Sequence, residues 1–100
     1  MKLVIDLDGT ICSEEKQFSR AMAVPIEGAI NALTLMKAQG HTIIIYSARA
    51  WAEYEMTVDW LGRHGATYDQ LVLGKPQGDY WIDDRALQFT GWKTILEKLL

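Results

Sequence analysis

The sequence predicts a single α/β domain in which a parallel sheet forms the middle layer of a three-layer α/β/α sandwich. Apolar runs of strand length, rich in β-branched residues, alternate with amphipathic stretches of helix length. The chain has 100 residues, of which 49% are hydrophobic, and this suits one compact domain with one core. No repeat or linker interrupts the pattern, so we expect one domain over 1–100.

The first half of the chain predicts a strand, a flap and a helix. Leu3–Leu7 is an apolar run closed by a turn, as expected of a buried strand. Residues 11–24 are polar in the middle without firm periodicity, which indicates a small flap. Pro25 stands at a helix entrance, and the apolar spacing after it predicts a helix over 26–39 that ends at a glycine.

The second half predicts three more strands and two helices. Ile43–Ser47 is an uninterrupted β-branched strand, and Ala50–Arg63 has helical periodicity with a wide apolar face. Two short strands are predicted at Leu71–Leu73 and Tyr80–Ile82, before an amphipathic helix over 92–100. This alternation implies right-handed βαβ units with helices on both faces of the sheet.

Charge and cysteine content limit the binding partners and the cellular compartment that we expect for this protein. Ten Lys and Arg against thirteen Asp and Glu give a net charge of −3, and the absence of a basic run disfavours nucleic-acid binding. The lone Cys12 cannot form an internal disulfide, no apolar stretch approaches the length of a membrane span, and no signal-peptide pattern is present. We therefore expect a cytoplasmic protein without membrane contact.

Polar side chains follow each predicted strand. Because ligands bind at the carboxyl ends of the strands of such sheets, these side chains are expected to meet at one edge. They are Asp6 and Asp8 after the first strand, Ser47 and Arg49 after the second, Lys75 after the third, and Asp83 and Asp84 after the fourth.

Four carboxylates in one pocket repel one another more strongly than one Lys and one Arg can offset, so the set predicts a bound cation. Oxygen ligands favour Mg²⁺, with water and a substrate phosphate completing its coordination. Beside the metal, one carboxylate could attack an electrophile and a second could transfer the proton. A hydroxyl and an ammonium group would hold the phosphoryl oxygens.

Four motifs in order, "DLDGT", "IIIYSAR", "GKP" and "YWIDD", resemble those of the haloacid dehalogenase-like hydrolase superfamily, whose domain is Rossmann-like. The resemblance implies that Asp6 is a nucleophile forming an aspartyl-phosphate and that Asp8 is the general acid and base. An acidic residue at position 8 distinguishes phosphatases of this superfamily from its dehalogenases.

The resemblance also implies the surrounding roles. Asp84 would hold Mg²⁺ together with Asp6 and the main-chain carbonyl of Asp8, with Asp83 as a supporting partner. Ser47 and Lys75 would bind phosphoryl oxygens, and Thr10 would support the loop. Ala48, Arg49 and Arg85 are left as substrate-contacting or structural residues.

The segments where this superfamily inserts cap domains are short here, so we expect no cap. An uncapped site suits a projecting substrate or a second subunit that closes the entrance, which makes a homo-oligomer one expectation. The resemblance extends to small bacterial phosphatases of capsule and surface-polysaccharide biosynthesis.

The predicted activity is Mg²⁺-dependent hydrolysis of a small phosphorylated metabolite such as a sugar phosphate. A phospho-acceptor signalling domain and a phosphatase of nucleotide or nucleic-acid ends remain as alternatives.

Overall fold

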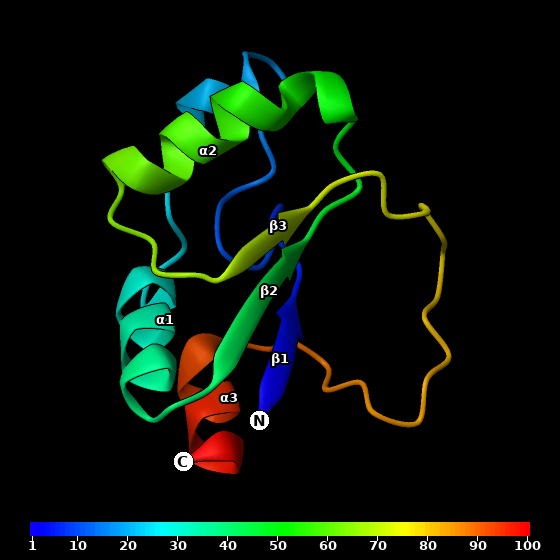
Figure 1. Ribbon diagram of the computed structural model, residues 1–100. Helices are drawn as coiled ribbons and strands as arrows, with labels where there is room; N and C mark the ends of the chain where they lie inside the picture. The colour runs from blue at the N-terminus through cyan, green and yellow to red at the C-terminus, as the bar shows by residue number, and fades with distance from the viewer.

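The computed structural model describes residues 1–100 and is built on a parallel three-stranded sheet of order β1-β2-β3 (Figure 1). The strands are β1 (Lys2–Ile5), β2 (Thr42–Tyr46) and β3 (Gln70–Val72). In the register, Ile5 lies beside Ile45 and Ile45 beside Leu71. The predicted α/β fold with a parallel sheet is confirmed.

Three helices and two short 3₁₀ turns accompany the sheet. The helices are α1 (Ala29–Ala38), α2 (Tyr54–Arg63) and α3 (Trp92–Leu99), and the turns are η1 (Arg20–Met22) and η2 (Trp51–Glu53). α1 begins later than the spacing predicts because Gly28, at φ 82°, caps it from a left-handed conformation. The predicted helix over Ala50–Arg63 divides into η2 and α2. None of the helices combines the length and the apolar character needed to cross a bilayer.

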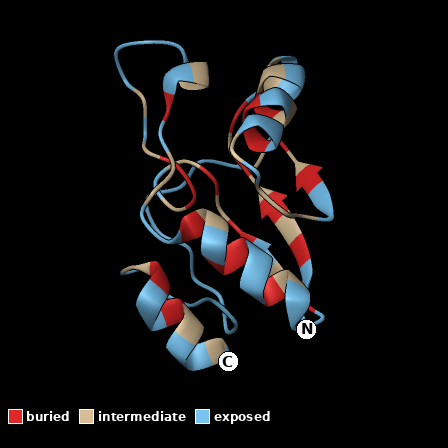
Figure 2. Cartoon of the chain, turned by 90° about the vertical axis from the view of Figure 1, so that its left-hand side faces the viewer, coloured by how far each residue is buried: buried red, intermediate tan, exposed pale blue.

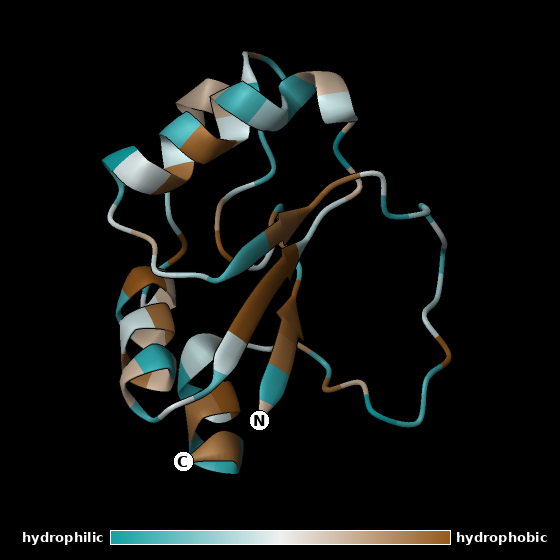
Figure 3. Cartoon of the chain, viewed as in Figure 1, coloured by the Kyte–Doolittle hydropathy of each residue, from teal (hydrophilic) through white to brown (hydrophobic).

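One face of the sheet carries the core. Ile5, Ile43, Ile45 and Leu71 alternate with less buried residues along the three strands, and they pack in one cluster with the buried sides of the helices. Figure 2 shows the buried residues on the strands and on one side of each helix, and Figure 3 shows most of β2 as apolar. The core therefore fixes the strand ends from which the polar residues of the next section emerge.

The predicted strand at Tyr80–Ile82 is wrong. This segment lies in the long connection between β3 and α3, residues 73–91, which runs away from the sheet and is called the arc below (Figure 1). Tyr80 and Ile82 are 88% and 99% exposed. A strand that joins a sheet in parallel needs a crossover of about a dozen residues or more. Only residues 73–79 separate β3 from Tyr80, and they contain no helix.

Candidate active site

Asp6 follows directly on β1, and its carboxylate lies between two of the predicted partners. Lys75 Nζ donates to Asp6 Oδ1 at 3.2 Å, and Thr10 Oγ1 donates to Asp6 Oδ2 at 3.3 Å. The side chain of Asp6 is 39% exposed and that of Lys75 is 17% exposed. Since a carboxylate has about four acceptor positions, Asp6 keeps free lone pairs on both oxygens.

Asp8 is held by a buried arginine. Arg49 donates from Nε to Asp8 Oδ2 at 2.9 Å and from Nη2 to Asp8 Oδ1 at 2.8 Å, while its Nη1 donates to Thr57 Oγ1 at 3.0 Å. The Arg49 side chain is 1% exposed and that of Asp8 is 20% exposed. The structure thus places Arg49 in a two-bond ion pair with a motif carboxylate, one of the two alternatives that its sequence position left open.

This pair sets the protonation of Asp8. Burial disfavours the charged form, but the hydrogen bonds and charge of Arg49 outweigh it and hold the pKa of the Asp8 carboxyl below its usual value. Asp8 is therefore an ionised carboxylate around neutral pH. The pKa of the neighbouring Cys12 thiol shifts in the other direction. Burial and the negative charge of Asp8 raise this pKa to about 12. The Cys12 thiol stays protonated and is unsuited to act as a nucleophile.

The loops after β2 and β3 are joined to each other behind these carboxylates. Lys75 N donates to the carbonyl of Ser47 and Gly74 N to the carbonyl of Arg49, both at 2.9 Å. Gly74 has φ 77°, and a Cβ there would lie 3.0 Å from the Trp51 indole nitrogen, so glycine is needed at this position. Ser47 is buried, and its Oγ accepts from Arg49 N at 3.2 Å, which makes it the support of this loop.

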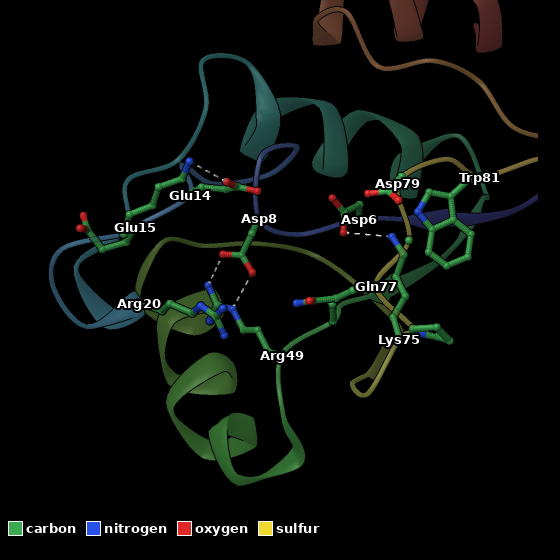
Figure 4. A pocket seen from close by; sticks show the side chains of 14 residues that line it. Asp6, Asp8, Glu14, Glu15, Arg20, Arg49, Lys75, Gln77, Asp79 and Trp81 are labelled. Carbon is green, nitrogen blue, oxygen red and sulfur yellow. Dashed lines mark hydrogen bonds and ion pairs between the residues drawn. The ribbon is translucent and has the colours of Figure 1, made fainter.

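A pocket of about 680 Å³ opens over these residues (Figure 4). It has the size of a small-molecule site, but its lining is largely polar. The predicted site residues in the lining are Asp6, Asp8, Ala48, Arg49 and Lys75. The sequence reasoning missed the others: Glu14, Glu15, Lys16 and Arg20 of the flap, and Pro76, Gln77, Gly78, Asp79 and Trp81 of the arc.

Trp81 takes part in holding Lys75. The Lys75 ammonium lies 4.9 Å from the centroid of the Trp81 ring and 5.7 Å from that of Tyr46. Such aromatic faces attract a cation, so they help to keep Lys75 beside Asp6. The aromatic character of residues 80–82, which the sequence reasoning assigned to a strand, was the only signal for this contact.

Five predicted site residues are not part of the pocket lining. Two of them are Thr10, which donates to Asp6, and Ser47, whose side chain is buried. Asp83, Asp84 and Arg85 are exposed in the arc, and their one hydrogen bond joins Arg85 N to Asp83 Oδ1 at 2.8 Å. No group of three or more His, Cys, Asp or Glu side chains is arranged to hold a metal. The structure therefore does not place Asp84 with Asp6 and Asp8, and its role as a metal ligand stays a prediction.

The remaining donors still suit Mg²⁺. Asp6 has free lone pairs, and the main-chain carbonyl of Asp8 accepts no hydrogen bond within the protein. Mg²⁺ is commonly held by only one or two carboxylates, with water and substrate phosphate oxygens as its other ligands. The pair of oxygens at Asp6 and Asp8 fits that pattern.

Comparison with known proteins gives matches among solved structures. No protein-family model matches the chain, and no curated protein matches it by sequence. A structural-genomics target from Vibrio cholerae is 26% identical, with a TM-score of 0.73, over 99% of this chain and 98% of that one. A chain of the Pnkp1/Rnl/Hen1 complex is 28% identical, with a TM-score of 0.64, over 83% of this chain and 31% of that one.

A further match shows the fold alone. The D,D-heptose 1.7-bisphosphate phosphatase from B. bronchiseptica, solved with magnesium and phosphate, is 16% identical and has a TM-score of 0.56. The match covers 85% of this chain and 53% of that one.

Proposed function

Because the chain has the fold of the haloacid dehalogenase-like hydrolases, with a phosphatase among its structural neighbours, we propose that it is a Mg²⁺-dependent phosphatase. It hydrolyses a phosphate monoester of a small metabolite, such as a sugar phosphate, through an aspartyl-phosphate at Asp6. The observation that carries this proposal is the contact of Asp6 with Lys75 and Thr10 at the end of β1, two residues before a second carboxylate. A nucleophile, a cation for phosphoryl oxygens and a proton-transfer group are thereby gathered in one pocket.

In the first half of the reaction, Asp6 attacks phosphorus and the bond to the leaving oxygen breaks. Lys75 and Ser47 bind phosphoryl oxygens, for which Ser47 turns its hydroxyl from the loop toward the pocket. Asp8 donates a proton to the leaving oxygen, so the product departs as a neutral alcohol. Arg49 favours the ionised form of Asp8, so this step needs a proton taken up from solvent, and the negative charge of the arriving phosphoryl group favours that uptake.

In the second half, Asp8 is the base. Its carboxylate takes a proton from water, the water oxygen attacks the phosphorus of the acyl phosphate, and Asp6 is released with inorganic phosphate. The ionised form that Arg49 favours is the one required here. Asp6 and the carbonyl of Asp8 would hold Mg²⁺, with Asp84 proposed as a third ligand, and the bound ion would offset charge on the phosphoryl oxygens.

Steady-state phosphate release with Mg²⁺ and with EDTA tests the activity. The panel contains sugar phosphates, nucleotides and a 3′-phosphorylated oligonucleotide. We expect turnover of the metabolite phosphates, and we expect EDTA to abolish this turnover and added Mg²⁺ to restore it. Turnover that persists fully in EDTA would contradict the metal requirement. A stable adduct from acetyl phosphate without turnover would favour the signalling alternative.

Phosphatase action on nucleic-acid ends is a second candidate. It is favoured by the similarity to a chain of the Pnkp1/Rnl/Hen1 complex, which is an RNA repair complex. The acidic balance of this chain opposes it. Preferential turnover of the 3′-phosphorylated oligonucleotide in the same panel would establish it. The implied link to polysaccharide biosynthesis and the cytoplasmic location stay predictions.

A further inference from the structure

We propose that Arg20 of the flap binds a second anionic group of the substrate, either a carboxylate or a second phosphate, on the leaving-group side of the pocket. This inference rests on the proposed phosphatase function and names the class of its substrates.

The position of Arg20 follows from the order of groups in the pocket. In the view of Figure 4, the Asp6–Lys75 pair lies on one side of Asp8, and the flap residues lie on the other. The transferred phosphoryl group belongs at Asp6, and its leaving oxygen belongs at Asp8. The rest of the substrate then extends toward the flap. Arg20 lines the pocket on that side.

Arg20 is fixed in place rather than freely rotating. Its Nη1 donates to both carboxylate oxygens of Glu53, at 3.0 and 2.8 Å, and Glu53 in turn accepts from Ala50 N at 3.1 Å. The side chain is 38% exposed. Because both the backbone and the guanidinium of Arg20 are anchored, the side chain loses little conformational freedom when a ligand binds, and this favours affinity.

The backbone around Arg20 is equally anchored to α2. Arg20 begins η1, where Ser19 Oγ accepts from Ala21 N at 3.2 Å. Trp60 Nε1 donates to the carbonyl of Ala23 at 2.8 Å, and Arg63 Nη2 to that of Ala21 at 3.4 Å. The flap is therefore a built wall of the pocket.

The guanidinium keeps unused donors. Every hydrogen bond of Arg20 within the protein uses Nη1, which leaves Nε and Nη2 without a protein partner. Arg49, by contrast, uses Nε, Nη1 and Nη2 on Asp8 and Thr57. Lys75 lies at Asp6, where the proposed function assigns it to the transferred phosphoryl group. Arg20 is thus the guanidinium of the pocket with a free donor edge, and a planar donor pair of this kind suits a carboxylate or a phosphate.

The test compares substrates that differ only in a second anion. Sorbitol 6-phosphate, 6-phosphogluconate and sorbitol 1,6-bisphosphate are open chains with a neutral, a carboxylate and a phosphate end. A three-carbon set of 3-hydroxypropyl phosphate, its carboxylate analogue and 1,3-propanediol bisphosphate has the same three kinds of end. In at least one set, the native protein is expected to show kcat/KM about tenfold or more higher for an anionic member than for the neutral one. The anionic member with the higher kcat/KM shows whether Arg20 binds a carboxylate or a second phosphate.

Three variants separate recognition from support of the flap. Arg20→Gln is expected to reduce the ratio of anionic to neutral kcat/KM by about tenfold, through KM. Glu53→Gln removes the anchor but keeps the cation, and it is expected to retain most of the preference. Lys98→Gln removes an equal charge from an exposed position of α3 outside the pocket and leaves the ratio at the native value. Where Arg20→Gln fails to fold, Arg20→Lys keeps a cation opposite Glu53 without the free donor edge and is also expected to lower the ratio.

The outcomes are distinct from those that test the phosphatase itself. Equal kcat/KM for neutral and anionic members in the native protein would overturn the assignment of Arg20 while leaving the phosphatase intact. Equal losses on all substrates in Arg20→Gln and Glu53→Gln would show that Arg20 only supports the flap. Absence of phosphate release from every substrate would instead refute the proposed function. A Kd for the product gluconate that weakens in Arg20→Gln, measured by calorimetry, would support the assignment independently of turnover.

Discussion

An Asp6→Asn variant is expected to lose phosphate release by roughly four orders of magnitude or more, because an amide cannot form the covalent phosphoryl intermediate. The side chain keeps its size, and its amide oxygen still accepts a hydrogen bond from Thr10 or Lys75. We therefore expect the folded structure to persist. The measurement is steady-state phosphate release with saturating Mg²⁺, on the best substrate of the panel.

Asp59→Asn is the matched control for this change. Asp59 is an exposed carboxylate on α2 that pairs with Arg63 and does not line the pocket. The control should retain native turnover, since a surface pair of this kind contributes little to stability. An Asp6→Asn protein that still turns over near the native rate would remove the covalent mechanism.

Replacing Arg49 with Met is expected to lower the free energy of unfolding by about 3 kcal/mol, the lower part of the range for breaking a buried ion pair. The change leaves the largely buried carboxylate of Asp8 without its partner and removes the donor to Thr57. Asp8 remains 20% exposed, and water there offsets part of the cost. The free energy of unfolding of small domains is only about 5–15 kcal/mol, so a loss of this size should be easily measured by urea unfolding.

A double-mutant cycle checks the cause. Adding Asp8→Asn to Arg49→Met removes the unpaired charge and should recover part of the lost stability. Arg63→Met, on the exposed side of α2, serves as the control and should change stability by well under about 1 kcal/mol. A similar small effect for Arg49→Met itself would mean that the ion pair does not support the fold.

The core of the site could be predicted from the sequence because it depends on local patterns. β1 and β2 are apolar, β-branched runs, and the residue after β1 must lie at the carboxyl edge of the sheet. The contact of Asp6 with Lys75 confirms that the ends of β1 and β3 meet. Whether Arg49 would face a carboxylate or the substrate could not be decided in advance, because the choice depends on burial that α2 creates around it.

The flap and the arc could not be predicted for a different reason. Residues 11–24 lack periodicity, so nothing in the sequence marks Arg20 as a pocket residue anchored by Glu53. The apolar triplet Tyr80–Ile82 has the composition of a strand, yet the short connection from β3 leaves it exposed. Asp84 depends on that triplet for its placement, and the prediction of its position therefore failed with it.

The most direct test of the central claim is to quench the protein in acid during turnover with Mg²⁺ and locate any bound phosphoryl group by mass spectrometry. We predict that a fraction of the native chain carries one phosphoryl group, that the modified peptide contains Asp6, and that hydroxylamine removes it, as expected of an acyl phosphate. Asp6→Asn should carry none. A phosphoryl group found on another residue, or rapid turnover without any phosphorylated chain in the quenched samples, would contradict the proposed mechanism.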